Sequence, residues 1–106
     1  MTLSQTPRSP VPQEVSTELQ RVVERWRQLP LDHALSYADR VRALAQSLAD
    51  GVADANGVST SVVPDLGPAT LMDQLTVMVH DASIAATTSA SATLAEDLAS
   101  LRRELR

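Results

Sequence analysis

The first apolar pattern in the chain lies between two prolines. Five apolar residues recur there at alternating steps of four and three: Val15, Leu19, Val22, Trp26 and Leu29. This spacing places them on one face of an α-helix. Proline near the first helical turn and Glu14 beside it suit a helix start. We therefore predict a helix that begins near Pro12 or Gln13 and ends before Pro30.

The second apolar pattern follows almost at once and is longer. Its members are Leu31, Leu35, Ala38, Val41, Ala45, Leu48, Val52 and Ala55. Asp32 is a candidate N-cap, and Asn56-Gly57 is a strong helix stop. Gly51 costs roughly 1 kcal/mol relative to alanine within a helix, so the last turns are weak. Because Pro30 leaves so short a link, the first two helices should form a hairpin or a sharply bent pair.

Residues 58–67, "VSTSVVPDLG", form the one long connection. We interpret it as a loop that closes one end of the bundle, with Val62, Val63 and Leu66 turned inward. Val58, Thr60 and Val62 also alternate with serine, which permits a short extended segment. Such a segment would need a second copy of the chain as its pairing partner. Loops of this length are uncommon in helical bundles and are often functional, so a binding role stays open.

From Pro68 to the end, two apolar stripes are separated by the small-residue run "AATTSASAT". The first stripe is Leu71, Leu75, Met78, Ala82 and Ala85, and the second is Leu94, Leu98, Leu101 and Leu105. On one straight helix the two stripes differ in direction by roughly 120°. The helix therefore either breaks near residues 88–92, or it continues and turns its second stripe toward another partner.

A break would give a fourth helix, for which Thr93 and Glu96 could form a capping box. Continuity is favoured, because no glycine or proline follows Pro68 and alanine is the best helix former. In that case the small residues mark a close crossing. Leu94, Leu98, Leu101 and Leu105 would then be covered by a second copy, and we predict them as a dimer interface.

These patterns together predict an all-α fold. It is a small helical bundle of a hairpin plus one long C-terminal helix, with a possible break near residues 88–92. Residues 1–12 carry three prolines without periodicity and are predicted to be a flexible tail. Residues 13–106 form a single helical domain.

Composition changes this picture in three ways. With 2% aromatic residues and no phenylalanine, the core is thin, and Trp26 should be its anchor. The net charge is −4, which argues against nucleic acid as a partner, because phosphate binding needs a basic surface. All nine basic residues are arginine, and with abundant alanine and valine this suggests a GC-rich bacterial genome.

Targeting signals are not evident. The N-terminal residues contain no apolar stretch of signal-peptide length, and no window approaches the roughly 20 apolar residues that a membrane span needs. We therefore expect a cytoplasmic protein without membrane contact.

Candidate catalytic chemistry is sparse. Cysteine is absent, and the two histidines, His33 and His80, each have only a neighbouring aspartate. No phosphate loop, HExxH motif or nucleophile elbow is present. We therefore expect no enzymatic activity, no catalytic residues, no metal site and no cofactor.

The function that fits these patterns is a non-enzymatic protein–protein interaction module. It would be a homodimeric adaptor or regulator that also binds an unknown protein. The alternative is a small ligand- or nucleic-acid-responsive regulator that uses the loop at residues 58–67. A stable oligomer would favour the first, and ligand binding at the loop the second.

Overall fold

The computed structural model describes residues 11–85 and 88–106, and helices dominate both parts. The elements are α1 (Gln13–Gln28), α2 (Leu31–Leu35), α3 (Ala38–Ala55), the 3-10 turn η1 (Pro68–Thr70), α4 (Leu71–Ala85) and α5 (Thr88–Glu104). No strand occurs in these two ranges, and the predicted all-α fold is confirmed. No described helix combines the length and the apolar character that crossing a bilayer would require.

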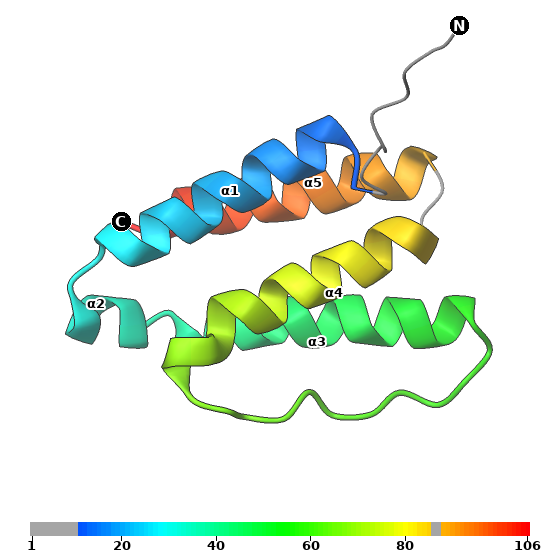
Figure 1. Ribbon diagram of the computed structural model, residues 1–106, viewed down its shortest axis with the longest axis horizontal. Coiled ribbons are helices and arrows are strands. Elements are labelled where there is room, and N and C mark those ends of the chain that lie inside the picture. Colours follow the sequence, from blue (N-terminus) through cyan, green and yellow to red (C-terminus); the bar gives the residue numbers. More distant parts are fainter. Residues whose placement is uncertain (1–10, 86–87) are drawn as a thin grey trace, which may run out of the picture.

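The four long helices of the described residues form two pairs (Figure 1). α1 packs along α5, and α3 packs along α4. Within each pair the helices run in the same direction, as the colours in Figure 1 show, and the two pairs run in opposite directions. The chain therefore goes up through α1, down through α3, down again through α4 and up through α5.

One apolar core joins the two pairs, and all four long helices contribute to it. Its fully buried large side chains are Val15 and Val22 of α1, Val41 of α3, Leu71, Leu75 and Val79 of α4, and Leu98, Leu101 and Leu105 of the C-terminal segment. Except for Val79, these residues are members of the stripes that helical periodicity selects. The amphipathic pattern therefore predicted most of the core correctly.

The C-terminal part of the chain is two helices, so the continuous helix that we favoured is wrong. α4 ends at Ala85, and α5 begins at Thr88 and runs back in the opposite direction. The four-helix alternative is the correct one. Thr93 and Glu96 lie inside α5 rather than at its start, so the predicted capping box is wrong as well.

This reversal changes the meaning of the second leucine stripe. Leu94, Leu98, Leu101 and Leu105 are at most 4% exposed and belong to the core of their own chain. The predicted dimer interface is therefore corrected: the four leucines face the chain's own helices. Folding back buries them without the loss of translational freedom that association with a second chain would cost.

The predicted second helix is bent near its start. α2 and α3 are separated at Ser36 and Tyr37, where Ser36 Oγ donates to the carbonyl of His33 at 2.6 Å. Serine hydroxyls compete in this way with backbone hydrogen bonds and bend helices. Asp32 lies in the first turn of α2, and Pro30 occupies the N-cap position that we predicted for Asp32.

The end of α3 follows the predicted stop signal. Gly57 has a φ of 67°, a left-handed conformation that glycine adopts without a Cβ clash. The N–H of Gly57 donates to Asp54 O at 3.1 Å, and that of Val58 donates to Ala53 O at 2.9 Å. These two bonds make a Schellman cap, which ends α3 and releases the chain as an extended loop.

Residues 58–67 must return along α3, because α3 and α4 are parallel. Figure 1 shows the loop running beside α3 from its end back to the start of α4. The return covers roughly 27 Å, the length of the 18 residues of α3 at 1.5 Å per residue. An extended residue advances about 3.3 Å, so the loop has little slack. The parallel pairing thus explains why this connection is long.

Two further predictions concerned Trp26 and the N-terminal tail. Trp26 packs against the core but is only partly buried, so it covers an edge of the core instead of anchoring its centre. Most of the predicted tail, residues 1–10, lies outside the described residues. Val11 is half-buried and packs against the core, so the packed part of the chain begins before residue 13.

Candidate functional site

The loop at residues 58–67 is fastened to α3 and α4 by polar side chains. The amide of Gln46 in α3 bridges two loop residues: its Nε2 donates to Ser61 O at 3.1 Å, and its Oε1 accepts from the N–H of Val63 at 2.8 Å. Gln74 Nε2 of α4 donates to Pro64 O at 2.8 Å. The loop therefore has a defined position on the bundle.

The carboxylate of Asp65 adds a further attachment. It accepts a hydrogen bond from Arg42 of α3 and another from the N–H of Gly67, both at 3.0 Å. Gly67 has a φ of 92°, so the chain turns there in a conformation that favours glycine. This turn delivers Pro68 to the first position of η1, where its missing N–H costs nothing.

The apolar side chains of the fastened loop face outward. Val62 is 84% exposed and Leu66 is 62% exposed, so the predicted inward orientation of these two residues is wrong. Val63 alone is half-buried. The core beneath is already filled by α3 and α4, and the loop crosses it from outside. The outward valine and leucine are therefore free for contact with something other than this chain.

A shallow groove of about 540 Å³ lies between this loop and α4. Its apolar lining includes Val62, Val63, Pro64, Leu66, Val77 and Met78. Val77, on the outer face of α4, is 52% exposed, and Ile84, seven residues further along the same face, is 62% exposed. We call residues 58–67 together with this outer face of α4 the loop surface.

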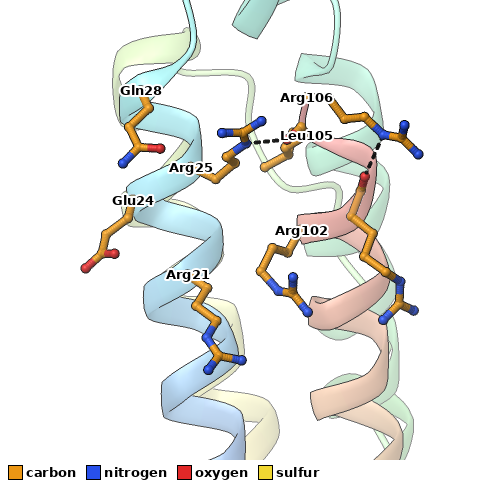
Figure 2. Close-up of a pocket in the computed structure, with 8 residues that line it drawn as sticks. Arg21, Glu24, Arg25, Gln28, Arg102, Leu105 and Arg106 are labelled. Atoms are coloured by element: carbon orange, nitrogen blue, oxygen red, sulfur yellow. Dashed lines mark hydrogen bonds between the residues drawn. The ribbon is translucent and has the colours of Figure 1, made fainter.

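A second groove, of about 500 Å³, lies at the other helix pair (Figure 2). It is lined by Arg21, Glu24, Arg25 and Gln28 of α1 and by Arg102, Arg103, Leu105 and Arg106 at the end of the chain. Five of the nine basic residues thus meet here. Figure 2 shows Arg21, Arg25 and Arg102 directed toward the space between α1 and α5. We call it the arginine groove.

The parallel direction of α1 and α5 accounts for these cations. The two C-terminal helix ends lie at the same end of the molecule (Figure 1), and each carries a partial negative charge of about half an electron. Arg25 Nε donates to Leu105 O at 2.7 Å, and Arg106 Nε donates to Arg103 O at 3.3 Å. The arginines therefore bind free carbonyls of the helix ends.

Carboxylates hold other arginines of the same groove. Glu18 of α1, whose side chain is 17% exposed, accepts from Arg102 of α5 at 2.8 Å and from Arg21 at 3.3 Å. Arg103 pairs with Glu96 at 3.0 Å. The groove is an internal clamp between α1 and α5, and its charges already have partners within the chain.

The two histidines contact different groups in the structure. Nε2 of His33 contacts the carbonyl oxygen of Arg106, and the ring stands edge-on to Tyr37 with centroids 5.3 Å apart. His80 lies on α4, half-exposed, with Nδ1 3.8 Å from Asp81. Within residues 11–85 and 88–106, no three histidine, aspartate or glutamate side chains are grouped as a metal site.

Comparison with known proteins adds no constraint to this geometry. No family model matches the chain, and no curated protein or solved structure is significantly similar to it.

Proposed function

We propose that this protein is a non-enzymatic protein–protein interaction module whose docking site is the loop surface. The observation that carries the proposal is a loop fixed in position with its apolar side chains outward. A flexible loop would have to be ordered on binding, at a cost in entropy. Here Gln46 and Gln74 already hold the backbone, so the surface is prepared for a partner.

The chemistry of the loop surface favours a protein partner over nucleic acid. Residues 58–64 carry no charge, and the ionisable side chain that lines the groove is the carboxylate of Asp73. A phosphate backbone would be repelled by this aspartate and by the net charge of −4. An apolar face of a helix or of an extended segment would instead bury Val62, Leu66 and Val77.

Burial of these three side chains would contribute favourably to binding. Full burial of a valine or leucine side chain contributes roughly 1.5–3 kcal/mol relative to exposure. Three such side chains around one groove would form the apolar centre of a small interface, with the loop serines and Asp73 at its rim. We include a second copy of the chain among the partners, as in the homodimer that the sequence suggested, but on this surface instead of the leucine stripe.

Site-specific photo-crosslinking in the cells that produce the protein tests this role. A benzophenone amino acid replaces Val77 on the loop surface, and in a matched variant it replaces Ser16, an exposed residue of α1. We expect a discrete crosslinked product from position 77 that disappears when Leu66→Asp is added. Equal products from both positions, or products insensitive to Leu66→Asp, would contradict the proposal.

The alternative, a ligand-responsive regulator, has one observation in its favour. The groove volume of about 540 Å³ falls within the range of small-molecule sites, which are mostly apolar with a few polar groups. A panel of apolar small molecules tested by thermal unfolding would reveal it. A rise in melting temperature that Leu66→Asp abolishes would shift the assignment from protein docking to ligand binding.

A further inference from the structure

The backbone of the loop has two edges, and between Ser59 and Val63 the described residues bind only one of them. Gln46 binds the carbonyl of Ser61 and the N–H of Val63, so alternate residues turn their polar groups toward α3. In an extended segment the residues between them point the opposite way. The N–H and C=O groups of Thr60 and Val62 therefore face away from α3.

Apart from the N–H of Val58, which donates to Ala53 O, this outer edge has no partner in the described part of the chain. No described group forms a hydrogen bond with the backbone of Ser59, Thr60 or Val62. All five residues from 58 to 62 are exposed, and Val58 is 61% exposed. Such an open edge is a template for pairing with another extended segment.

The sequence of this edge is symmetric about Thr60. It reads Val58-Ser59-Thr60-Ser61-Val62, the same in both directions. A two-fold axis relates identical surfaces of two copies, so it requires a segment that complements itself. Antiparallel pairing centred on Thr60 places Val58 opposite Val62 of the other copy, Ser59 opposite Ser61 and Thr60 opposite Thr60.

We propose that two copies of the chain associate by antiparallel pairing of residues 58–62 around a two-fold axis at Thr60. The proposal rests on the interaction role of the loop surface proposed above and names a second copy as its partner. Thr60 forms the central hydrogen-bonded pair, because its backbone groups point outward. The N–H of Val62 then reaches the carbonyl of Val58 in the other copy.

The hydrogen bonds and side chains set the strength of this pairing. The N–H of Val58 is already donated to Ala53 O, so the two strands exchange roughly four hydrogen bonds. Pairs of β-branched residues across strands add to them. So small an interface is weak, with association expected in the micromolar to millimolar range.

Net charge also shapes the association. Each copy carries −4, and the exposed Asp50 and Asp54 lie near the start of the paired segment. Salt screens this repulsion, so the dimer should strengthen as ionic strength rises. An association held by ion pairs between the copies would show the opposite trend.

Two proline variants test the pairing with a matched control. Thr60→Pro removes the central N–H, whereas Ser59→Pro removes an N–H of the other edge. Neither N–H has a partner in the described chain, and proline suits an extended exposed segment, so both variants should fold as the wild type does by circular dichroism. Sedimentation velocity from about 10 µM to 1 mM covers the range of weak interfaces.

We expect Thr60→Pro to weaken self-association by roughly tenfold or more and Ser59→Pro to leave it nearly unchanged. In the wild type, amide exchange at Thr60 and Val62 should slow as concentration rises, while exchange at Ser59 and Ser61 should not. A monomeric wild type at the highest concentration overturns the pairing. A dimer that tolerates Thr60→Pro but is lost in Leu66→Asp also overturns it, yet leaves the proposed docking function intact.

Discussion

The two parallel helix pairs differ in what they leave open on their outer surfaces. Between α1 and α5, the arginine groove contains charges that are bound by Glu18, Glu96 and carbonyls of the helix ends. Between α4 and the loop, the groove is apolar and its side chains are partly exposed. The first groove closes a contact inside the molecule, and the second leaves apolar side chains partly exposed.

This difference shows that charge density alone is a poor guide to a binding site. Five arginines in one groove suggest an anion site until the direction of the helices is known. Parallel helices bring two negative dipole ends together, and arginine offsets them. The apolar side chains of the loop surface have no comparable partner among the described residues, and Val62 and Leu66 stay 84% and 62% exposed.

The largest predicted effect on stability concerns the core that both helix pairs share. Leu98→Ala should lower the free energy of unfolding by about 2–5 kcal/mol, because Leu98 is fully buried among helices of its own chain. Urea unfolding followed by circular dichroism measures the change. Leu66→Ala, at an exposed position, is the matched control and should change stability by no more than about 0.5 kcal/mol. A Leu98→Ala protein of wild-type stability would restore the leucine stripe as an intermolecular contact.

Helices and core were predictable because amphipathic periodicity is local. Each stripe depends on residues three or four apart, and caps such as Gly57 depend on immediate neighbours. The reversal after Ala85 carries no glycine or proline, and the sequence signalled it only through the rotation between two stripes. We assigned that rotation to a contact with a second chain. Folding back within one chain is favoured, because linked segments meet at high effective concentration.

The candidate site was less predictable for a geometric reason. Gln46 and Gln74 hold the loop from α3 and α4. Their separation in sequence from the loop residues that they bind follows no repeat, so no spacing marks them as anchors. The expectation that Val62 and Leu66 turn inward followed from their apolar character. It failed because the parallel direction of α3 and α4, which the sequence pattern did not reveal, places the loop outside a core that is already complete.

The next largest predicted effect on stability concerns the ion pairs of the arginine groove. Glu18→Gln keeps the side-chain shape but removes the charge that binds Arg102 and Arg21. Since Glu18 is largely buried, we expect the free energy of unfolding to fall by about 1–2 kcal/mol. Glu96→Gln alters an exposed pair and should cost less than about 0.5 kcal/mol. If both variants lost the same stability, the groove would not clamp α1 to α5.

A smaller effect concerns the fastening of the loop. Gln46→Ala removes both hydrogen bonds to Ser61 and Val63 and should lower global stability by about 1 kcal/mol or less. Its local effect should be larger: amide exchange at Val63 should accelerate, because its N–H loses its acceptor. Gln20→Ala, in an exposed pair on α1, serves as the control. Unchanged exchange at Val63 would mean that the loop is held by other contacts.

The smallest predicted effect on stability concerns the loop surface, where we expect binding to be lost while the fold is kept. Leu66→Asp with Val77→Asp replaces two exposed apolar side chains, 62% and 52% exposed, by charged ones. Because neither position is in the core, the free energy of unfolding should change by no more than about 0.5 kcal/mol per position. Binding at the loop surface should nevertheless be lost, since a carboxylate buried against an apolar partner costs far more than the contact it replaces. Crosslinking from position 84, on the same face of α4, reads out that loss without altering either substituted residue. A double variant that unfolds would show that the loop surface supports the fold, and one that still crosslinks would place docking elsewhere on the bundle.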